Sequence, residues 1–256
     1  MERQHLISAK YPISWVLILF GLYLASLYSY LFFHSVAEIF GIVVACGIFM
    51  IAWNSRRFLD NNYLLLLGIA YLFVAVLDLT HTLAYTGMGV FPGYATNLPT
   101  QLWVATRYTE SISLLIAPLF LERGLKIRFA FVGYAAAVTL LLGAIFYWNI
   151  FPDCFIEGVG LTPFKKISEY IISLILLASI AAVIQKRKAF DTRVLRLLVA
   201  SIIMTIASEL SFTFYVSAYG LSNLIGHFFK IISFYLIYKA IIERVPSGVK
   251  RQMSSV

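Results

Sequence analysis

The sequence predicts an all-α, polytopic integral membrane bundle of about eight transmembrane helices, with both termini on the cytoplasmic side. Three observations support this prediction: the shortage of charge, the recurrence of long apolar runs and the placement of lysine and arginine. Hydrophobic residues make up 61% of the 256 residues, charged residues only 12%, and mean hydropathy is +0.87. Soluble domains carry about 25% charged residues, so the solvent of this chain is expected to be largely lipid.

Long apolar runs recur along the whole chain. They lie at 14–33, 36–53, 63–85, 101–121, 129–148, 167–184, 194–218 and 222–243. Runs of about 18–25 residues can cross a hydrocarbon core about 30 Å thick at 1.5 Å per residue. Because backbone amides in lipid need partners within their own segment, we expect helices rather than isolated strands. Only His34 and Ser35 separate the first two runs.

The basic residues predict the orientation of these helices. Lysine and arginine gather in alternate connecting segments, and the segments between them carry only Lys165 and Lys166. The sixteen residues of the basic side are Arg3, Lys10, Arg56, Arg57, Arg123, Lys126, Arg128, Lys186, Arg187, Lys188, Arg193, Arg196, Lys239, Arg244, Lys250 and Arg251. Cytoplasmic segments carry such an excess, so both termini are expected inside, after an even number of crossings. The net charge of +8 is explained by these cytoplasmic segments at the bilayer surface, so no nucleic-acid partner is expected.

Seven ionisable residues lie within runs that otherwise suit lipid. They are Asp78, His81, Arg107, Glu110, Glu209, His227 and Lys230. Six of them form pairs spaced i,i+3, so each pair shares one helix face. In the predicted topology all seven fall about 6–14 Å below the outer boundary, counted at 1.5 Å per residue. Charges at that depth cost several kcal/mol each unless they are paired or hydrated, which predicts a polar pocket in the outer half of the bundle.

The chemistry of this set leaves several readings open. The three carboxylates would be acceptors or cation ligands, the two cations would be anion clamps or counter-ions, and the two histidines would be ligands or titrating groups. His81 and His227 are candidate ligands of a divalent transition metal, with Asp78 and Glu110 beside them, or axial ligands of a haem. The alternative is an ion-pair network that only fixes helix packing.

Three further ionisable residues are weaker candidates. His34 and Glu38 are placed at the outer mouth of the first two helices, where they either border the pocket or lie at the interface. Glu169 falls near the entrance of a helix and is expected to be solvated. The chain contains no HExxH, P-loop or nucleophile-elbow pattern, so catalysis by this chain is not expected.

Four stretches of the sequence resemble one known family. They are GIAYLFVAVLDLTHTLAY, GMGVFPGYATNLPTQLW, ATRYTESISLLIAPLFL and, near the end, HFFKIISFYLIYKAIIE. In these stretches the chain resembles the third class of bacterial membrane-associated sensor (MASE) domains. The resemblance implies a sensory input module of the inner (cytoplasmic) membrane that is joined at its C-terminus to PAS, histidine-kinase or diguanylate-cyclase domains. Its setting would be a two-component system or cyclic-di-GMP signalling.

We therefore expect residues 1–245 to form an eight-helix membrane sensor domain and residues 246–256 to begin a cytoplasmic linker to an output domain absent from this chain. A small ligand, metal, cofactor or proton would enter the polar pocket, and the last helix would carry the change through Ile241–Arg244 to a kinase or cyclase. Assembly as a homodimer is left open. The alternatives are a transporter or proton-coupled carrier and a haem-binding b-type redox membrane protein. Transport is disfavoured because no repeat symmetry or paired helix-breaking segment is found.

Overall fold

The computed structural model describes the backbone of residues 2–57, 61–213 and 220–254, and the side chains of residues 14–57, 61–213 and 220–242. Within these ranges the chain is all-α, as predicted, apart from one short hairpin. The helices are α1 (Glu2–Tyr28), α2 (Tyr30–Ser55), α3 (Tyr63–Ala84), α4 (Asn97–Ile116), α5 (Ile127–Phe146), α6 (Pro163–Gln185), α7 (Thr192–Thr213) and α8 (Leu221–Ser254), with two 3-10 turns, η1 (Ala117–Leu121) and η2 (Arg187–Ala189). Strands β1 (Phe155–Ile156) and β2 (Gly160–Leu161) pair antiparallel.

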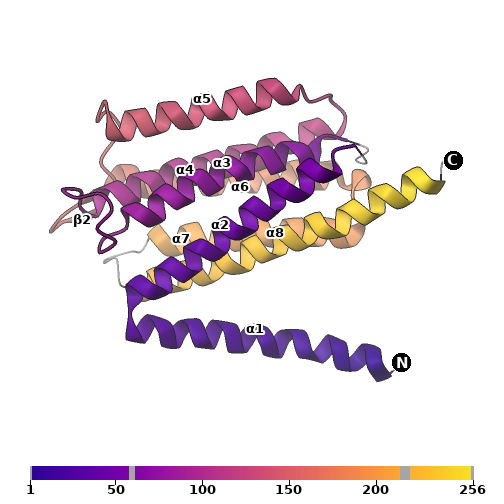
Figure 1. The fold of residues 1–256 in the computed structure, drawn as a ribbon, viewed down its shortest axis with the longest axis horizontal. Helices are drawn as coiled ribbons and strands as arrows, with labels where there is room; N and C mark the ends of the chain where they lie inside the picture. The colour runs from indigo at the N-terminus through magenta and orange to yellow at the C-terminus, as the bar shows by residue number, and fades with distance from the viewer. Residues whose placement is uncertain (1, 58–60, 214–219, 255–256) are drawn as a thin grey trace.

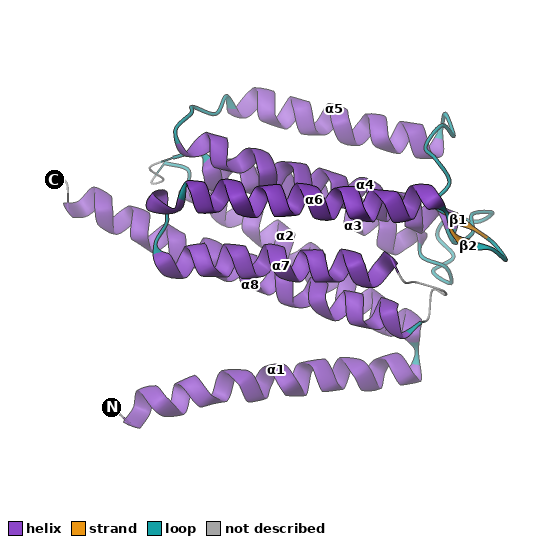
Figure 2. Ribbon diagram, turned by 180° about the vertical axis from the view of Figure 1, so that it is seen from behind, coloured by secondary structure: helices purple, strands orange, loops and turns teal. Residues whose placement is uncertain are grey.

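Six of the described helices are long and apolar enough to cross a membrane, namely α2, α3, α5, α6, α7 and α8. The described apolar part of α1 is shorter, at Ser14–Tyr28, and α4 carries charged residues in its middle. The chain is therefore a multi-pass membrane protein, whereas eight crossings and the inside location of both termini stay predictions. Both termini lie at one end of the bundle, and the β-hairpin lies at the other (Figure 1, Figure 2).

The helices differ in how much of their surface is buried. Helices α2, α3, α4, α6, α7 and α8 pack together, while α1 and α5 lie along opposite edges (Figure 1, Figure 2). In α4, 14 of the 20 residues are buried, and the described side chains of α5 include only two buried ones, Val138 and Ile145. A helix that is apolar on all sides and little buried suits a lipid-facing position, whereas the polar α4 is enclosed by its neighbours.

The boundary between the first two helices differs from the sequence prediction. The chain breaks at Ser29, not at His34 and Ser35. Ser29 is extended (φ −153°, ψ 113°), and its hydroxyl accepts a hydrogen bond from the Phe32 N–H, which makes it the N-cap of α2. His34 and Glu38 consequently lie inside α2, four residues apart and on one helix face.

The loops at the hairpin end are joined to the start of α4. The Asn97 side chain donates to Asp153 Oδ1 (2.7 Å) and accepts from the Cys154 N–H (2.8 Å). The Thr96 N–H donates to the carboxylate of Glu157 (3.1 Å). Helix α4 therefore begins four residues before the predicted start at 101, because the hairpin loop supplies partners for its first turn.

Candidate functional site

The described part of the bundle buries eleven histidine and charged side chains, each exposing 5% or less of its surface. They are His34, Glu38, Asp78, His81, Arg107, Glu110, Lys165, Glu169, Glu209, His227 and Lys230. All seven residues that were predicted to form the pocket belong to this set. Four more were not predicted as members, and two of those, His34 and Glu38, come from α2.

Arg107 of α4 is the centre of the first half of the network. Its Nη2 donates to both carboxylate oxygens of Asp78 on α3, at 2.8 and 3.1 Å, and its Nη1 donates to Glu110 one turn along α4. The hydroxyl of Tyr71 donates to the other oxygen of Glu110 (2.9 Å). Because Nη2 contacts Asp78 and Nη1 contacts Glu110, one guanidinium group joins carboxylates from α3 and α4.

Lys230 of α8 connects this half to α2. Its Nζ donates to Asp78 Oδ1 at 3.2 Å and to Glu38 Oε2 at 2.6 Å. The second oxygen of Glu38 lies 3.3 Å from Nε2 of His227, one turn earlier on α8. Glu38 is thus central to the network, although the sequence left it as a residue that either borders the pocket or lies at the interface. The signal that would have found it is its i,i+4 spacing from His34 within one apolar helix.

Trp103 of α4 brings Glu209 into the network. Its indole N–H donates to Glu209 Oε2 on α7 (3.3 Å). The Trp103 ring also lies 4.8 Å from the guanidinium carbon of Arg107 and 4.8 Å from the ammonium nitrogen of Lys230. Cations at such distances are attracted to the face of an indole ring, so Trp103 stabilises both charges away from water.

The expectation that Glu169 is solvated was wrong. Its side chain is fully buried and forms an ion pair with Lys165, one turn earlier on α6. The first turn of a transmembrane helix usually meets water, but here the adjoining strand β2 contributes buried Leu161 to the same end of the bundle. Burial of a helix end by a neighbouring loop depends on tertiary structure, so the hydropathy of α6 does not predict it.

The three buried histidines differ in their hydrogen bonds. Nδ1 of His81 lies 2.8 Å from the Pro99 carbonyl, and Nδ1 of His227 lies 2.7 Å from the Asn223 carbonyl. A carbonyl only accepts, so in both rings Nδ1 carries the proton and Nε2 presents a lone pair when the ring is neutral. The His34 ring stacks on Tyr85 with centroids 3.5 Å apart, and neither of its nitrogens has a hydrogen-bond partner among the described residues.

A small cavity of about 40 Å³ lies beside these rings. Its wall includes the three histidines together with Thr96 and Leu161 from the loop end. A cavity needs about 10–15 Å³ to hold one water molecule, so this one has room for a few waters or an ion with its remaining ligands. The loop residues in its wall place it near the end of the bundle that carries the hairpin.

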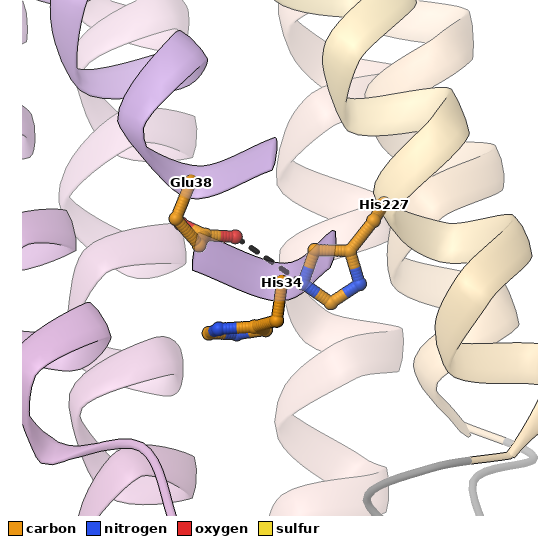
Figure 3. A group of neighbouring side chains, drawn as sticks. All are labelled: His34, Glu38 and His227. Atoms are coloured by element: carbon orange, nitrogen blue, oxygen red, sulfur yellow. Dashed lines mark ion pairs between the residues drawn. The ribbon is translucent and has the colours of Figure 1, made fainter. Parts of the chain in front are cut away.

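One group of potential metal ligands forms among the described histidine, cysteine and acidic residues. It consists of His34, Glu38 and His227, each with one ligand atom within 4.8 Å of the others. Figure 3 shows the Glu38 carboxylate directed toward the His227 ring, with His34 one turn away on α2. This group contains His227 but not His81, so the pairing of those two histidines stays a prediction from the sequence.

A family comparison covers the whole network. The family model MASE3, described as a membrane-associated sensor domain, matches residues 25–245. The chain belongs to the MASE3 family. The resemblance drawn from four stretches of sequence is thereby confirmed, and the eleven buried histidine and charged residues named above all lie within the matched range. No curated protein and no solved structure matches the chain.

Proposed function

We propose that this MASE3 domain is the sensory input module of a multi-pass protein of the bacterial inner membrane. It detects a small ligand in the buried polar network and signals through α8 to a cytoplasmic kinase or cyclase. The ligand-contacting set comprises the seven residues predicted from the sequence together with His34 and Glu38. The observation that carries this proposal is that Lys230, a residue of the last helix, holds carboxylates from both α2 and α3 beside a cavity.

Helix α8 is suited to carry a change away from this network. It is one helix of 34 residues, or about 50 Å at 1.5 Å per residue, and it runs from the pocket to the opposite end of the bundle. Its contacts to Glu38 and Asp78 come from residues in its second and third turns. A ligand that alters those contacts would shift the far end of the helix, and residues 246–256 would lead that movement toward the effector.

The energies involved are large enough for switching. Removing one partner of a buried ion pair costs about 3–5 kcal/mol. The ratio of two conformations changes tenfold for each 1.4 kcal/mol of difference in their free energy. A ligand that changed the pairing of Glu38 or Asp78 would therefore change the ratio between two positions of α8.

The other half of the bundle favours sensing over transport. Its interior between the network and the terminal end is filled by apolar side chains such as Ile48, Leu64, Leu67, Leu198 and Ile237. A carrier needs a polar path that opens to both sides, and helix-breaking segments at the midplane usually provide it. A polar pocket at one end of the bundle, separated from the other end by an apolar core, suits a receptor that transmits binding through movements of its helices.

The test is a fusion in which residues 1–256 precede the catalytic part of a diguanylate cyclase or histidine kinase. Lys230→Met and Glu38→Gln should each change basal output by at least about threefold, because each shifts the pairing of α8. The matched control is Lys186→Met, which removes an exposed pair with Glu122 at the other end of the bundle. The proposal fails if both network variants reach the membrane at normal levels and give the same output as Lys186→Met.

A second arm tests the route through α8. One, two, three or four residues are inserted after Ile242, each of which rotates the effector by about 100° relative to the network. Output should vary with a period close to one helical turn, so the four-residue insertion should resemble the parent more than the two-residue insertion does. Output that is independent of insertion length would rule out transmission through this helix.

A further inference from the structure

Four potential ligand atoms are buried together without a hydrogen-bond partner among the described residues. They are both ring nitrogens of His34, Nε2 of His227 and Oε1 of Glu38. An unsatisfied buried polar atom costs about 1–3 kcal/mol, so native structures contain few of them. Facing turns of α2 and α8 bring these atoms together, with Glu38 Oε1 and His227 Nε2 3.3 Å apart, and one bound ion could contact three of the four.

Their spacing is close to that of a coordination sphere. Nitrogen and oxygen ligands lie about 2.0–2.2 Å from a zinc-like ion, which in tetrahedral geometry separates neighbouring ligand atoms by about 3.4 Å. His227 Nε2 and Glu38 Oε1 are already 3.3 Å apart. The largest separation in the group is 4.8 Å, so the His34 ring would have to close by about 1.4 Å at most.

The ligand types and their outer contacts point to the same class of ion. Two imidazoles and one carboxylate suit first-row transition metals, and three protein ligands leave an open position, here toward the cavity. The Asn223 carbonyl holds the proton of His227 on Nδ1, which leaves Nε2 free to coordinate. Stacking on Tyr85 sets the plane of the His34 ring.

The buried formal charges of the network sum to a negative value. Five buried carboxylates (Glu38, Asp78, Glu110, Glu169 and Glu209) face three buried cations (Arg107, Lys165 and Lys230) in the described part of the bundle. The excess of two negative charges is expensive in a lipid-surrounded interior. One divalent ion would neutralise that excess.

From these observations we propose that His34, Glu38 and His227 bind one divalent first-row transition-metal ion, and that this ion is the ligand which the domain detects. Its role as a stimulus rests on the proposed function, whereas its binding does not. Glu38 would then use Oε1 for the metal and Oε2 for Lys230. Occupancy would weaken the hold of Glu38 on Lys230, because the metal withdraws charge from the shared carboxylate, and α8 would respond.

Cobalt(II) is the probe, since it replaces zinc-like ions and absorbs visible light in a way that depends on its ligands. Purified protein is stripped with a chelator in detergent and titrated with Co²⁺, with helicity and monodispersity checked for every variant. We expect one Co²⁺ per chain, displaced by Zn²⁺. His34→Gln, Glu38→Gln and His227→Gln should each weaken binding by about 10–100-fold or more.

Lys186→Met is the control, because its exposed ion pair with Glu122 lies at the opposite end of the bundle and outside the three-ligand group. It should weaken binding by less than about threefold, and an effect as large as that of His34→Gln would overturn the assignment of ligands. X-ray absorption at the cobalt edge of the unaltered protein covers the case in which a variant does not fold. Two imidazoles and one carboxylate are expected in that spectrum.

The site is disproved if Co²⁺ does not bind at one per chain, or if the absorption edge shows no histidine. Either result would leave the reporter response to Lys230→Met intact, so the sensory role would stand with another ligand. The converse result, normal Co²⁺ binding with a reporter that ignores Lys230→Met, would remove the sensory role and keep the metal site.

Discussion

Lys230→Met removes a cation whose two carboxylate partners, Asp78 and Glu38, differ in the contacts that they keep without it. The substitution keeps an unbranched side chain that is one atom shorter and removes its charge, which leaves two buried carboxylates without their shared cation. Asp78 keeps both hydrogen bonds from Arg107, at 2.8 and 3.1 Å. Glu38 keeps only the neighbouring ring of His227, at 3.3 Å. Glu38 is therefore the group that the substitution strands.

The expected loss in the free energy of unfolding is about 3–5 kcal/mol, which is typical when one member of a buried pair is removed. Adding Glu38→Gln removes the stranded charge and should restore roughly half of that loss. Adding Asp78→Asn should restore less than about 1 kcal/mol, because it takes a paired charge away from Arg107. The double variant with Glu38→Gln should therefore be more stable than the one with Asp78→Asn, because Asp78 keeps its hydrogen bonds from Arg107 and Glu38 does not have such a partner.

Unfolding by SDS titration in mixed micelles, followed by tryptophan fluorescence, gives these free energies. Lys186→Met is the control, since its side chain is 38% exposed and its partner Glu122 is 71% exposed. An exposed pair contributes about 0–1 kcal/mol. The reasoning is refuted if Lys230→Met costs no more than Lys186→Met, or if Asp78→Asn restores stability better than Glu38→Gln.

Three further predictions concern packing, a thiol and topology. In Gly68→Ala the new Cβ would lie 2.4 Å from the Cβ of the facing alanine in α2, so thermal unfolding should show a loss of about 1–3 kcal/mol, whereas Gly133→Ala in α5, with nothing within 4 Å, should not be destabilised. Burial raises the pKa of the Cys154 thiol from 9.0 to about 12, so the thiol stays protonated at pH 8. In a variant that lacks the other cysteine, iodoacetamide should therefore react with Cys154 only after unfolding. Reaction with the native protein at pH 8 would contradict this prediction. Cysteines placed at Val159, 80% exposed in the hairpin, and at Lys188 should be labelled by an impermeant maleimide from opposite sides of the membrane, and labelling from the same side would contradict the predicted topology.

The class of fold and the order of the helices could be predicted because lipid imposes a strict rule on composition. An apolar run of sufficient length has to be a helix, and the described helices overlap every predicted run. The gathering of Asp78, Arg107, Glu110 and Lys230 followed from the same rule, since charges in lipid need partners and the depths of these residues along three runs agreed. Depth could not say which charge meets which, because it gives one coordinate and leaves the rotation of each helix unknown.

The features that the sequence did not predict depend on single residues or on segments that are distant in sequence and bury a side chain. Ser29 ends one helix and caps the next without interrupting the apolar run, so the break was placed five residues too late and His34 and Glu38 were left at the membrane surface. The hairpin has strands of two residues, too short for any alternation to show. Its turn could have been found from Gly158 and Gly160, which adopt the positive φ values of 78° and 100° that favour glycine.

The late break in the first run also explains why the sequence paired His81 with His227 as metal ligands and left His34 out of the pair. With His34 outside the bilayer, only two histidines remained at a common depth, and any metal site had to pair His81 with His227. Moving the break to Ser29 turns the face of α2 inward and brings a third imidazole within 4.9 Å of the His227 ring, measured between centroids. Glu38 lies on that same face, four residues further along α2, and presents its carboxylate to His227 and Lys230 of α8. The residues expected at the site therefore changed with a helix boundary that is marked by a hydrogen bond from the Phe32 N–H to the Ser29 hydroxyl, which hydropathy cannot detect.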